Sequence, residues 1–263
     1  MATLEGKKVV IIGGTSGIGY AVAKASLVSL AEHVLVASSS PDKVQAAVSR
    51  LCAEPGLQKL QPGLSKRISG EVVDMTNTES IKSFFAKVGE IDHLAVTSGR
   101  FPGTTDFKAI ELSQAQGKLQ QSRVPTSTHY GSELAFFNER IWSIITAVQS
   151  AKLRKGGSIT LTVGLLLHKP VPGSAIITSA MGALEGLTRA LAIDLAPIRV
   201  NAVSPGAIET ELWDTLQPAA KEAMLEGLVE KLPVKHVARP EEVAEVYVLL
   251  MKYVYDWLMP IAC

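Results

Sequence analysis

Short apolar runs alternate along the chain with longer stretches in which apolar residues recur at helical spacing. The runs are hydrophobic at almost every position, which is typical of strands buried on both faces of a parallel sheet. Strands are predicted over residues 7–12, 33–37, 71–73, 91–96, 158–163 and 198–203. This β–α alternation predicts an α/β protein with one doubly wound parallel sheet that carries helices on both faces.

Amphipathic helices are predicted between these strands. They cover residues 17–31, a stretch through Val44 and Val48, and residues 78–88, 134–152 and 178–195. In the last of these, Met181, Leu184 and Leu187 fall on one stripe, so this side of the helix should face the sheet. No Pro-, Gly- or Ser-rich linker divides the chain. A single domain over residues 1–263 is therefore expected.

Two stretches do not fit the alternation. Residues 100–132 are polar and too long for an ordinary connection, so they form either a lid beside the site or a disordered insertion. Residues 211–235 are amphipathic and include Trp213. They form either a helix pair packed on the core or, as part of residues 207–235, a flap over a substrate.

Composition excludes several classes of protein. The chain has 263 residues, of which 26 are basic and 25 acidic, and nucleic-acid binding would need clustered positive charge. No apolar run approaches the roughly 20 residues that cross a bilayer, and no signal-peptide segment opens the chain. We therefore expect a soluble cytoplasmic protein without membrane contact. Cys52 and Cys263 are too few for a disulfide framework, and no metal site is expected.

A glycine-rich turn follows the first predicted strand and opens a helix. Glycines let the backbone turn sharply and approach a pyrophosphate, and the helix N-terminus then directs N–H groups at the anion. The sequence therefore predicts a dinucleotide-binding turn, and the alternative is a turn that is merely tight. The expected contacts are Gly13, Thr15, Ser16, Gly17, Ile18 and Gly19.

The end of the second strand distinguishes NAD from NADP. An acidic residue there would bind both ribose hydroxyls of NAD and repel a 2′-phosphate. The chain instead has Ser38, Ser39 and Ser40, with Lys43 one turn later. Hydroxyl and ammonium groups suit a 2′-phosphate, so NADP(H) is favoured as the cofactor. The alternative is that Lys43 is only a solvated helix residue.

Several ordered motifs make the chain similar to the short-chain dehydrogenase/reductase family over nearly its whole length. The Gly-x-x-x-Gly-x-Gly turn of that family matches Gly13, Gly17 and Gly19, and its Arg-Val-Asn-x-Val-x-Pro-Gly segment is present at residues 199–206. The resemblance implies a Rossmann-type fold, a nicotinamide cofactor and a homo-oligomer, either a dimer or a tetramer. It also implies further cofactor contacts from Asp74, Met75, Thr97, Ser98, Gly99, Pro205, Gly206, Ile208 and Thr210.

The residues with which this family delivers a proton are all replaced. The family uses Tyr-x-x-x-Lys with a Ser and an Asn, and its Tyr protonates the carbonyl oxygen. By resemblance, Ile177 and Met181 stand at the Tyr and Lys positions. Val163 stands at the Ser position and Arg140 at the Asn position. Reduction of an ordinary ketone therefore has no evident acid–base residue.

Two kinds of reaction proceed without a proton donor. Hydride addition to an iminium ion gives a neutral amine, and a pericyclic ring closure is accelerated mainly by positioning. The chain resembles fungal members of the family in bicyclodiazaoctane indole alkaloid pathways, which lack the Tyr and Lys and couple NADPH reduction of an iminium to a Diels–Alder reaction. A secondary-metabolism enzyme for an apolar substrate is thus expected. The predicted pocket residues are Val163, Ser174, Ile177, Met181 and Trp213.

Arg140 is the leading polar candidate for catalysis, because it could orient a substrate carbonyl or stabilise a developing anion. The alternative is an outward helix residue paired with Glu139. His168 follows the fifth predicted strand, and a loop histidine of this kind is more often solvated than catalytic. Ser174 and Thr178 could donate weak hydrogen bonds, although Thr178 is rather expected to cap a helix.

Three other functions stay open. The first is a cyclase or isomerase with structural NADP(H), the second a carbonyl reductase with an atypical site, and the third an inactive binding module. Activity that does not change with NADP⁺ would select the first, and ketone turnover the second. A bound partner protein without any turnover would select the third.

Overall fold

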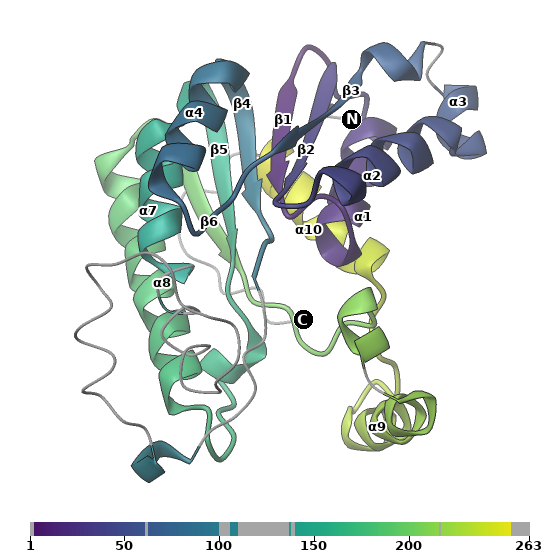
Figure 1. Cartoon of the computed structure of the whole chain (residues 1–263), viewed down its shortest axis with the longest axis vertical. Helices are drawn as coiled ribbons and strands as arrows, with labels where there is room; N and C mark the ends of the chain where they lie inside the picture. Colours follow the sequence, from purple (N-terminus) through teal and green to yellow (C-terminus); the bar gives the residue numbers. More distant parts are fainter. Residues whose placement is uncertain are drawn as a thin grey trace.

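The strands form one parallel sheet. The computed structural model describes residues 3–60, 63–99, 106–109, 137, 140–215 and 217–253. The sheet has six strands in the order β3-β2-β1-β4-β5-β6 (Figure 1). The strands are β1 (Lys8–Ile12), β2 (His33–Ser38), β3 (Ile68–Val72), β4 (Glu90–Val96), β5 (Lys152–Thr162) and β6 (Arg199–Val203). The strand order reverses between β1 and β4, where sheets of this type bind ligands at the carboxyl ends. The predicted doubly wound α/β fold is confirmed.

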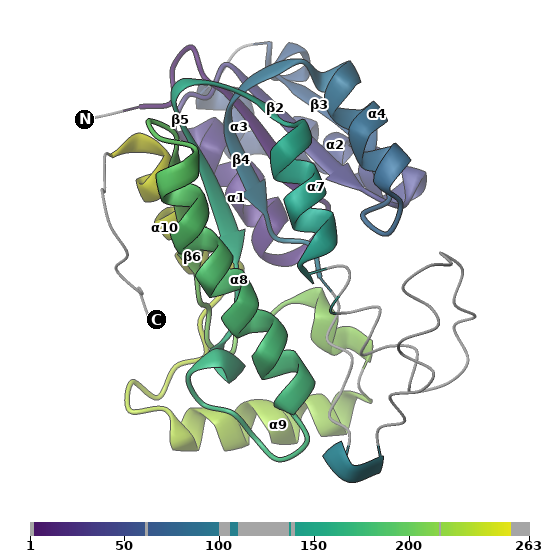
Figure 2. The ribbon, with the colours of Figure 1, turned by 90° about the vertical axis from the view of Figure 1, so that its left-hand side faces the viewer.

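Helices cover both faces of the sheet (Figures 1 and 2). One layer contains α1 (Gly17–Val28), α2 (Pro41–Ala53), α3 (Pro55–Leu60) and α10 (Pro240–Lys252). The other contains α4 (Thr78–Val88), α7 (Trp142–Ser150) and α8 (Ala175–Asp194), and it faces the viewer in Figure 2. The remaining described elements are η1 (Leu64–Lys66), η2 (Phe107–Ala109), η3 (Leu165–Leu167), η4 (Glu211–Thr215) and α9 (Pro218–Lys231).

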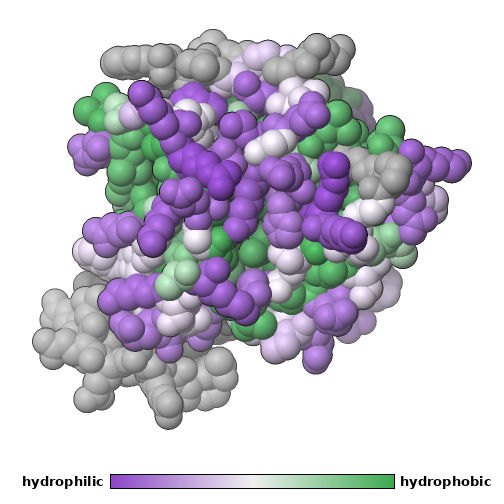
Figure 3. All heavy atoms as spheres, turned by 90° about the horizontal axis from the view of Figure 1, so that it is seen from above, coloured by the Kyte–Doolittle hydropathy of each residue, from purple (hydrophilic) through white to green (hydrophobic). Residues whose placement is uncertain are grey.

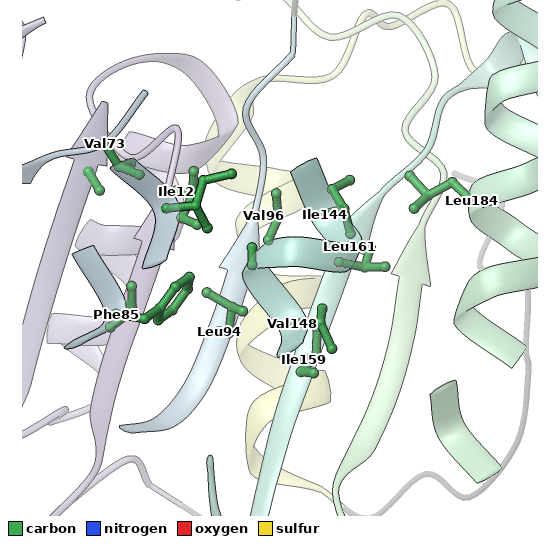
Figure 4. Close-up of a cluster of buried hydrophobic side chains, with 14 of the residues drawn as sticks. Ile12, Val73, Phe85, Leu94, Val96, Ile144, Val148, Ile159, Leu161 and Leu184 are labelled. Carbon is green, nitrogen blue, oxygen red and sulfur yellow. The ribbon is translucent and has the colours of Figure 1, made fainter. Parts of the chain in front are cut away.

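Alternating side chains of the strands build a separate core on each face. Figure 4 shows Ile12, Leu94 and Val96 of the sheet together with Phe85 of α4 and Ile144 of α7. All five are at most 1% exposed. Burial of one such side chain stabilises the fold by about 1.5–3 kcal/mol. This core fixes the carboxyl ends of β1 and β4, on which the candidate site is built.

The largest difference from the predicted elements lies between α7 and β5. The sequence predicts a helix through residue 152 and a strand from residue 158, but α7 ends at Ser150 and β5 begins at Lys152. The first residues of β5 pair with the start of β4, and an irregularity then shifts the register. Pairing with β4 therefore overrides the local pattern of this polar stretch. The third strand also begins earlier than predicted, at Ile68.

The edge at which the strands begin is charged, and Figure 3 shows hydrophilic side chains over the centre of this face. The buried carboxylate of Asp92 accepts hydrogen bonds from the backbone N–H of Lys8 (2.9 Å), from Lys7 (3.2 Å) and from Arg154 (3.1 Å). Burial raises the pKa of Asp92, but these donors and their charges outweigh burial and hold the pKa below its usual value. The bonds tie β1, β4 and β5 together at the edge opposite the site.

One described helix, α8, is long and apolar enough to cross a membrane by length and composition alone. The expectation that no apolar run reaches such a length is therefore wrong for this helix. Ile177, Met181 and Leu184 of α8 are buried against the sheet, as in the core helix of a globular fold. Apart from residues 106–109, the predicted insertion over 100–132 lies outside the described residues.

Candidate nucleotide-binding site and its reactive end

The turn between β1 and α1 has no room for side chains at its glycines. Gly13 has φ +89°, and a Cβ there would lie 2.5 Å from the backbone nitrogen of Ser98. A Cβ on Gly19 would collide with the carbonyl of Gly13. Gly17 has φ +49°, and a Cβ there would press on the side chain of Thr210. The three glycines thus keep the backbone bare where α1 begins, as the sequence predicts.

The segment after β4 packs directly on this turn. The backbone N–H and hydroxyl of Thr97 donate to the carbonyl of Ile12 at 2.9 and 3.1 Å, and the N–H of Ser98 donates to the same oxygen at 3.1 Å. The structure therefore brings together two segments that the sequence predicts to contact one cofactor. Three more predicted contacts lie on the turn and differ in exposure: Thr15 is buried, Ile18 is half-buried and Ser16 is exposed.

The N-terminus of α1 already binds a carboxylate. The backbone N–H of Gly17, the first residue of α1, donates to Oε2 of Glu211 at 2.7 Å. Glu211 belongs to η4, 194 residues away in the sequence. Free amide N–H groups and the helix dipole favour an anion at this point. The first turn of α1 contains no acidic residue of its own, so the sequence around the turn gave no signal for this contact.

The residues predicted for the adenosine end lie at the end of β2 and after β3. Ser38 is half-buried, whereas Ser39 and Lys43 are exposed. The hydroxyl of Ser40 accepts the backbone N–H of Lys43 at 3.4 Å and so caps α2. The carboxylate of Asp74 accepts two hydrogen bonds from Thr76, at 2.9 and 2.7 Å, which fix its orientation. The neighbouring Met75 is half-buried and packs against the core.

Apolar side chains occupy the start of α8 and the end of β5. Ile177 is 1% exposed, Met181 6% and Val163 5%, and all three belong to one core cluster. The methyl group of Met181 lies 3.8 Å from the position that a Cβ on Gly164 would take. These side chains pack as part of the core and bring no titratable group to this end of the site.

Hydroxyl groups beside this apolar cluster are engaged in local hydrogen bonds. Ser174 precedes α8, donates to the carbonyl of Val171 at 2.6 Å and accepts the N–H of Val171 at 3.0 Å. Thr178 donates to the carbonyl of Leu166 at 3.1 Å. Because α8 begins at Ala175, the prediction that Thr178 caps this helix is wrong. His168 is exposed, directly after η3.

Arg140 is buried and bridges the ends of two strands. Its guanidinium group donates to the carbonyl of Ser98 at 2.9 Å and to the carbonyl of Thr162 at 3.4 Å. The guanidinium carbon lies 2.6 Å from the position that a Cβ on Gly99 would take. The interpretation of Arg140 as an outward surface residue is therefore wrong. The residue lies between the predicted cofactor segment after β4 and the end of β5. We call Val163, at the end of β5, together with the start of α8 the reactive end, because the family resemblance places the reacting residues there.

The segment after β6 closes the site from the other side. Pro205 is buried and accepts a hydrogen bond from the N–H of Leu165 at 3.1 Å, which joins the loops after β5 and β6. Gly206 is half-buried. Ile208 is buried and forms a parallel bridge with Ala238. Thr210 leads into η4, where Trp213 is half-buried.

A tyrosine that the sequence analysis did not single out lies under the end of β5. Tyr247 of α10 is fully buried, and its hydroxyl lies 2.6 Å from that of Thr162. Thr162 donates its own proton to the carbonyl of Val96, so Tyr247 donates to Thr162. Burial raises the pKa of Tyr247 above its usual value, and the group stays neutral. In the sequence, Tyr247 differs from its apolar neighbours on the buried side of α10 only by its hydroxyl group.

The described residues contain no group of three or more His, Cys, Asp or Glu side chains that could hold a metal ion. The candidate site is therefore built from a bare-backbone turn, a buried arginine and apolar side chains. The bare backbone of the turn suits an anionic dinucleotide, Arg140 is held by two backbone carbonyls, and the apolar side chains bring no titratable group.

Comparisons with known proteins agree with this geometry. The model of the SDR-like Rossmann domain matches residues 2–256. Three fungal proteins described as short-chain dehydrogenase/reductases are similar over most of both chains. ATR9 of Stachybotrys chlorohalonatus is 35% identical (96% of this chain, 93% of the relative), and ucsE of Acremonium sp is 34% identical (96% and 91%). The third, malC of Malbranchea aurantiaca, is 31% identical (95% and 89%).

Solved structures show the same fold. The structure of MalC reductase/Diels-Alderase from Malbranchea aurantiaca superposes with a TM-score of 0.76 and 28% identity, over 94% of this chain and 90% of that one. A small-chain dehydrogenase in complex with NADPH gives a TM-score of 0.67 and 26% identity, over 97% and 94%. From the family match, the relatives and the glycine turn together, the chain belongs to the short-chain dehydrogenase/reductase family.

Proposed function

We propose that the chain is an NADP(H)-dependent enzyme of secondary metabolism that reduces an iminium ion, closes a ring by a Diels–Alder-type reaction, or does both. Its substrate is an apolar intermediate of the indole alkaloid type. One observation carries this proposal: a bare-backbone turn follows β1, whereas apolar side chains occupy the start of α8. The first suits a dinucleotide, and the second offers no proton.

The residues of the turn fit a dinucleotide. Gly13 and Gly19 keep two backbone positions free of Cβ atoms, and the N–H of Gly17 already binds the carboxylate of Glu211. A pyrophosphate oxygen carries negative charge and accepts hydrogen bonds, as that carboxylate does. Residues 13–19 would therefore hold the pyrophosphate. When bound, NADPH would supply the hydride of the reduction.

The preference for NADP(H) over NAD(H) would come from the end of β2. Ser39 and Lys43 are exposed there, and together they could bind a 2′-phosphate. Ser40 is occupied in capping α2 and would contribute less. A related structure contains NADPH, which supports a nicotinamide cofactor in general terms.

The described side chains at the start of α8 indicate which reaction the site would support. A ketone that accepts hydride leaves an oxyanion, which must be protonated, whereas an iminium ion becomes a neutral amine. Ile177 and Met181 have no proton to give, and the hydroxyls of Ser174 and Thr178 already donate to backbone carbonyls. The described side chains near the start of α8 therefore favour the iminium reaction.

Arg140 supplies the polar contact of the reactive end. Its guanidinium is held by the carbonyls of Ser98 and Thr162, so its position is fixed before a substrate binds. A fixed positive charge stabilises negative charge that develops on an adjacent oxygen. We infer that Arg140 orients a carbonyl group of the substrate, such as an amide next to the reacting ring.

The relatives support the choice of substrate class. The solved relative is named a reductase/Diels-Alderase, and the start of α8 in this chain is apolar. Apolar side chains at this end of the site favour a substrate such as a prenylated indole over a sugar. By family resemblance we also expect a cytoplasmic homo-oligomer. Trp142 of α7 is exposed, and a second copy of the chain could cover it.

The proposal is tested by the loss of NADPH absorbance with two matched compounds, a cyclic dihydroisoquinolinium ion and the ketone tetralone. We expect NADPH consumption with the iminium ion and none with the ketone. The Gly19→Val variant, in which the turn is blocked, measures the uncatalysed background. Tetralone turnover at a comparable rate would instead indicate a carbonyl reductase. Ring closure of an alkaloid-type precursor that is equally fast with NADP⁺ would indicate a non-redox cyclase.

A further inference from the structure

Glu211 stands where an anionic ligand of α1 would stand. The N–H of Gly17 donates to Glu211 at 2.7 Å, and the side chain of Thr210 lies over the same glycine. α1 has 12 residues, and its first N–H groups have no partner within the helix. In doubly wound folds the pyrophosphate of a dinucleotide is bound at this helix end. The carboxylate and the pyrophosphate therefore require the same N–H group.

Glu211 belongs to residues 207–235, which we call the flap. The flap is anchored at its base, where Ile208 bridges Ala238 and the N–H of Glu209 donates to the carbonyl of Ala238 at 3.0 Å. Within the flap, Lys221 of α9 forms an ion pair with Asp214 of η4 at 2.8 Å. η4 and α9 are thus linked to each other, and η4 lies between α1 and α9 in Figure 1.

The flap has little packing of its own to hold it in place. No residue of α9 is buried, so the sequence interpretation of a helix pair packed on the core is wrong for this helix. Segments with few buried apolar contacts open at low cost in free energy. A single charged hydrogen bond from α1 can therefore decide how much of the time such a segment is closed.

We propose that Glu211 is a latch that competes with the cofactor: its carboxylate holds the flap against the empty turn, and the pyrophosphate of the dinucleotide displaces it. The inference rests on the proposed binding of NADP(H) to this turn. Because the latched form cannot accept the pyrophosphate, the apparent affinity for the cofactor is lowered by the latched fraction. Cofactor binding releases η4 and α9, which frees the flap to rearrange over a substrate.

The first test compares the affinity for NADP⁺ of the wild type and the Glu211→Gln variant by titration calorimetry. Glutamine keeps the shape of the side chain and removes its charge, so the dissociation constant should fall about fivefold. The control is Glu226→Gln, which removes one exposed charge from α9 of the same flap and should leave affinity within about twofold. An unchanged or weaker affinity of Glu211→Gln would overturn the latch.

The second test needs no nucleotide. Hydrogen exchange of the apo protein should be faster over residues 207–235 in Glu211→Gln than in the wild type or Glu226→Gln. Inorganic pyrophosphate should raise this exchange in the wild type and leave it unchanged in Glu211→Gln. Equal exchange in all three proteins would contradict the latch. Failure of NADP⁺ to bind any of them would refute the proposed function, and the apo comparison would still decide the inference.

Discussion

The two ends of the candidate site differ in the kind of constraint that shapes them. At the end of β1 the constraint is on the backbone, since side chains at Gly13 or Gly19 would collide with neighbouring main chain. At the start of α8 the backbone is not restricted in this way, and only the chemical nature of the side chains decides what the site can do. There Ile177 and Met181 are part of the hydrophobic core. Under the proposed function, the chain keeps a cofactor turn although apolar residues stand at the start of α8, and the fold accommodates this because those positions pack well with apolar side chains.

The largest expected effect is at the backbone-constrained end. Gly19→Val should abolish NADP⁺ binding, with a loss of roughly 100-fold or more, because its Cβ would collide with the carbonyl of Gly13. Gly186→Ala is the matched control, since a Cβ on Gly186 of α8 meets nothing within 4 Å. Titration calorimetry measures binding, and circular dichroism shows whether each variant is folded. Tight binding by a folded Gly19→Val protein would show that the backbone of this turn does not limit nucleotide binding.

A second prediction separates the chemistry of the site from the stability of the fold. His93 lies in β4, bonded to Ser158 at 2.8 Å, and burial lowers its pKa from 6.5 to about 4. Between these pH values the unfolded chain takes up a proton that the folded chain refuses, so stability falls as pH falls from 6.5 towards 4. The loss is on the order of 3 kcal/mol. Activity on an iminium ion should be flat above pH 6.5 and decline below it only with unfolding.

Denaturant titrations across this pH range test the assignment to His93. The His93→Gln variant should lose most of the pH dependence of stability between 6.5 and 4, and the remainder should come from His33, whose pKa is also lowered by burial. The His168→Gln variant, at an exposed position, should keep the full dependence. The opposite pattern would show that the loss of stability at low pH does not come from the buried His93. A bell-shaped rate profile in fully folded protein would reveal an acid–base group at the reactive end and would weaken the contrast between the two ends.

A third prediction concerns Arg140, which lies between the two ends of the site. Arg140→Met removes the guanidinium that binds the carbonyls of Ser98 and Thr162. We expect kcat/KM for the iminium substrate to fall about 10- to 100-fold, because a fixed charge near the reacting atoms is lost. The dissociation constant of NADP⁺ should change about twofold or less, because the pyrophosphate is held by residues 13–19. If affinity fell and turnover did not, Arg140 would belong to the cofactor end instead.

The smallest effect is expected at the end of β2. Lys43→Ala should weaken NADPH binding about fivefold and leave NADH binding unchanged, since an exposed ammonium group contributes about 1 kcal/mol to a phosphate contact. Fluorescence titration with both nucleotides measures this difference. Equal weakening for both nucleotides would show that Lys43 does not bind the 2′-phosphate.

The features predicted from the sequence are those encoded within short stretches. A strand such as β1 is apolar at four of its five positions, and the glycine turn is recognisable because side chains do not fit there. The start of β5 was missed because pairing with β4, rather than local pattern, makes that polar stretch extended. Two contacts join residues far apart in the sequence: Glu211 and Gly17 are 194 positions apart, and Tyr247 and Thr162 are 85 positions apart. No local sequence pattern predicts such contacts.

Under the proposed function, a nucleotide-binding turn lies beside a reactive end whose described side chains include no proton donor. Single-turnover reactions with NADPH deuterated at C4 of the nicotinamide test it most directly. We expect deuterium to appear in the amine formed from a cyclic iminium ion and no labelled alcohol to form from the matched ketone. Labelled alcohol formed from the ketone at a comparable rate would show that the reactive end does supply a proton.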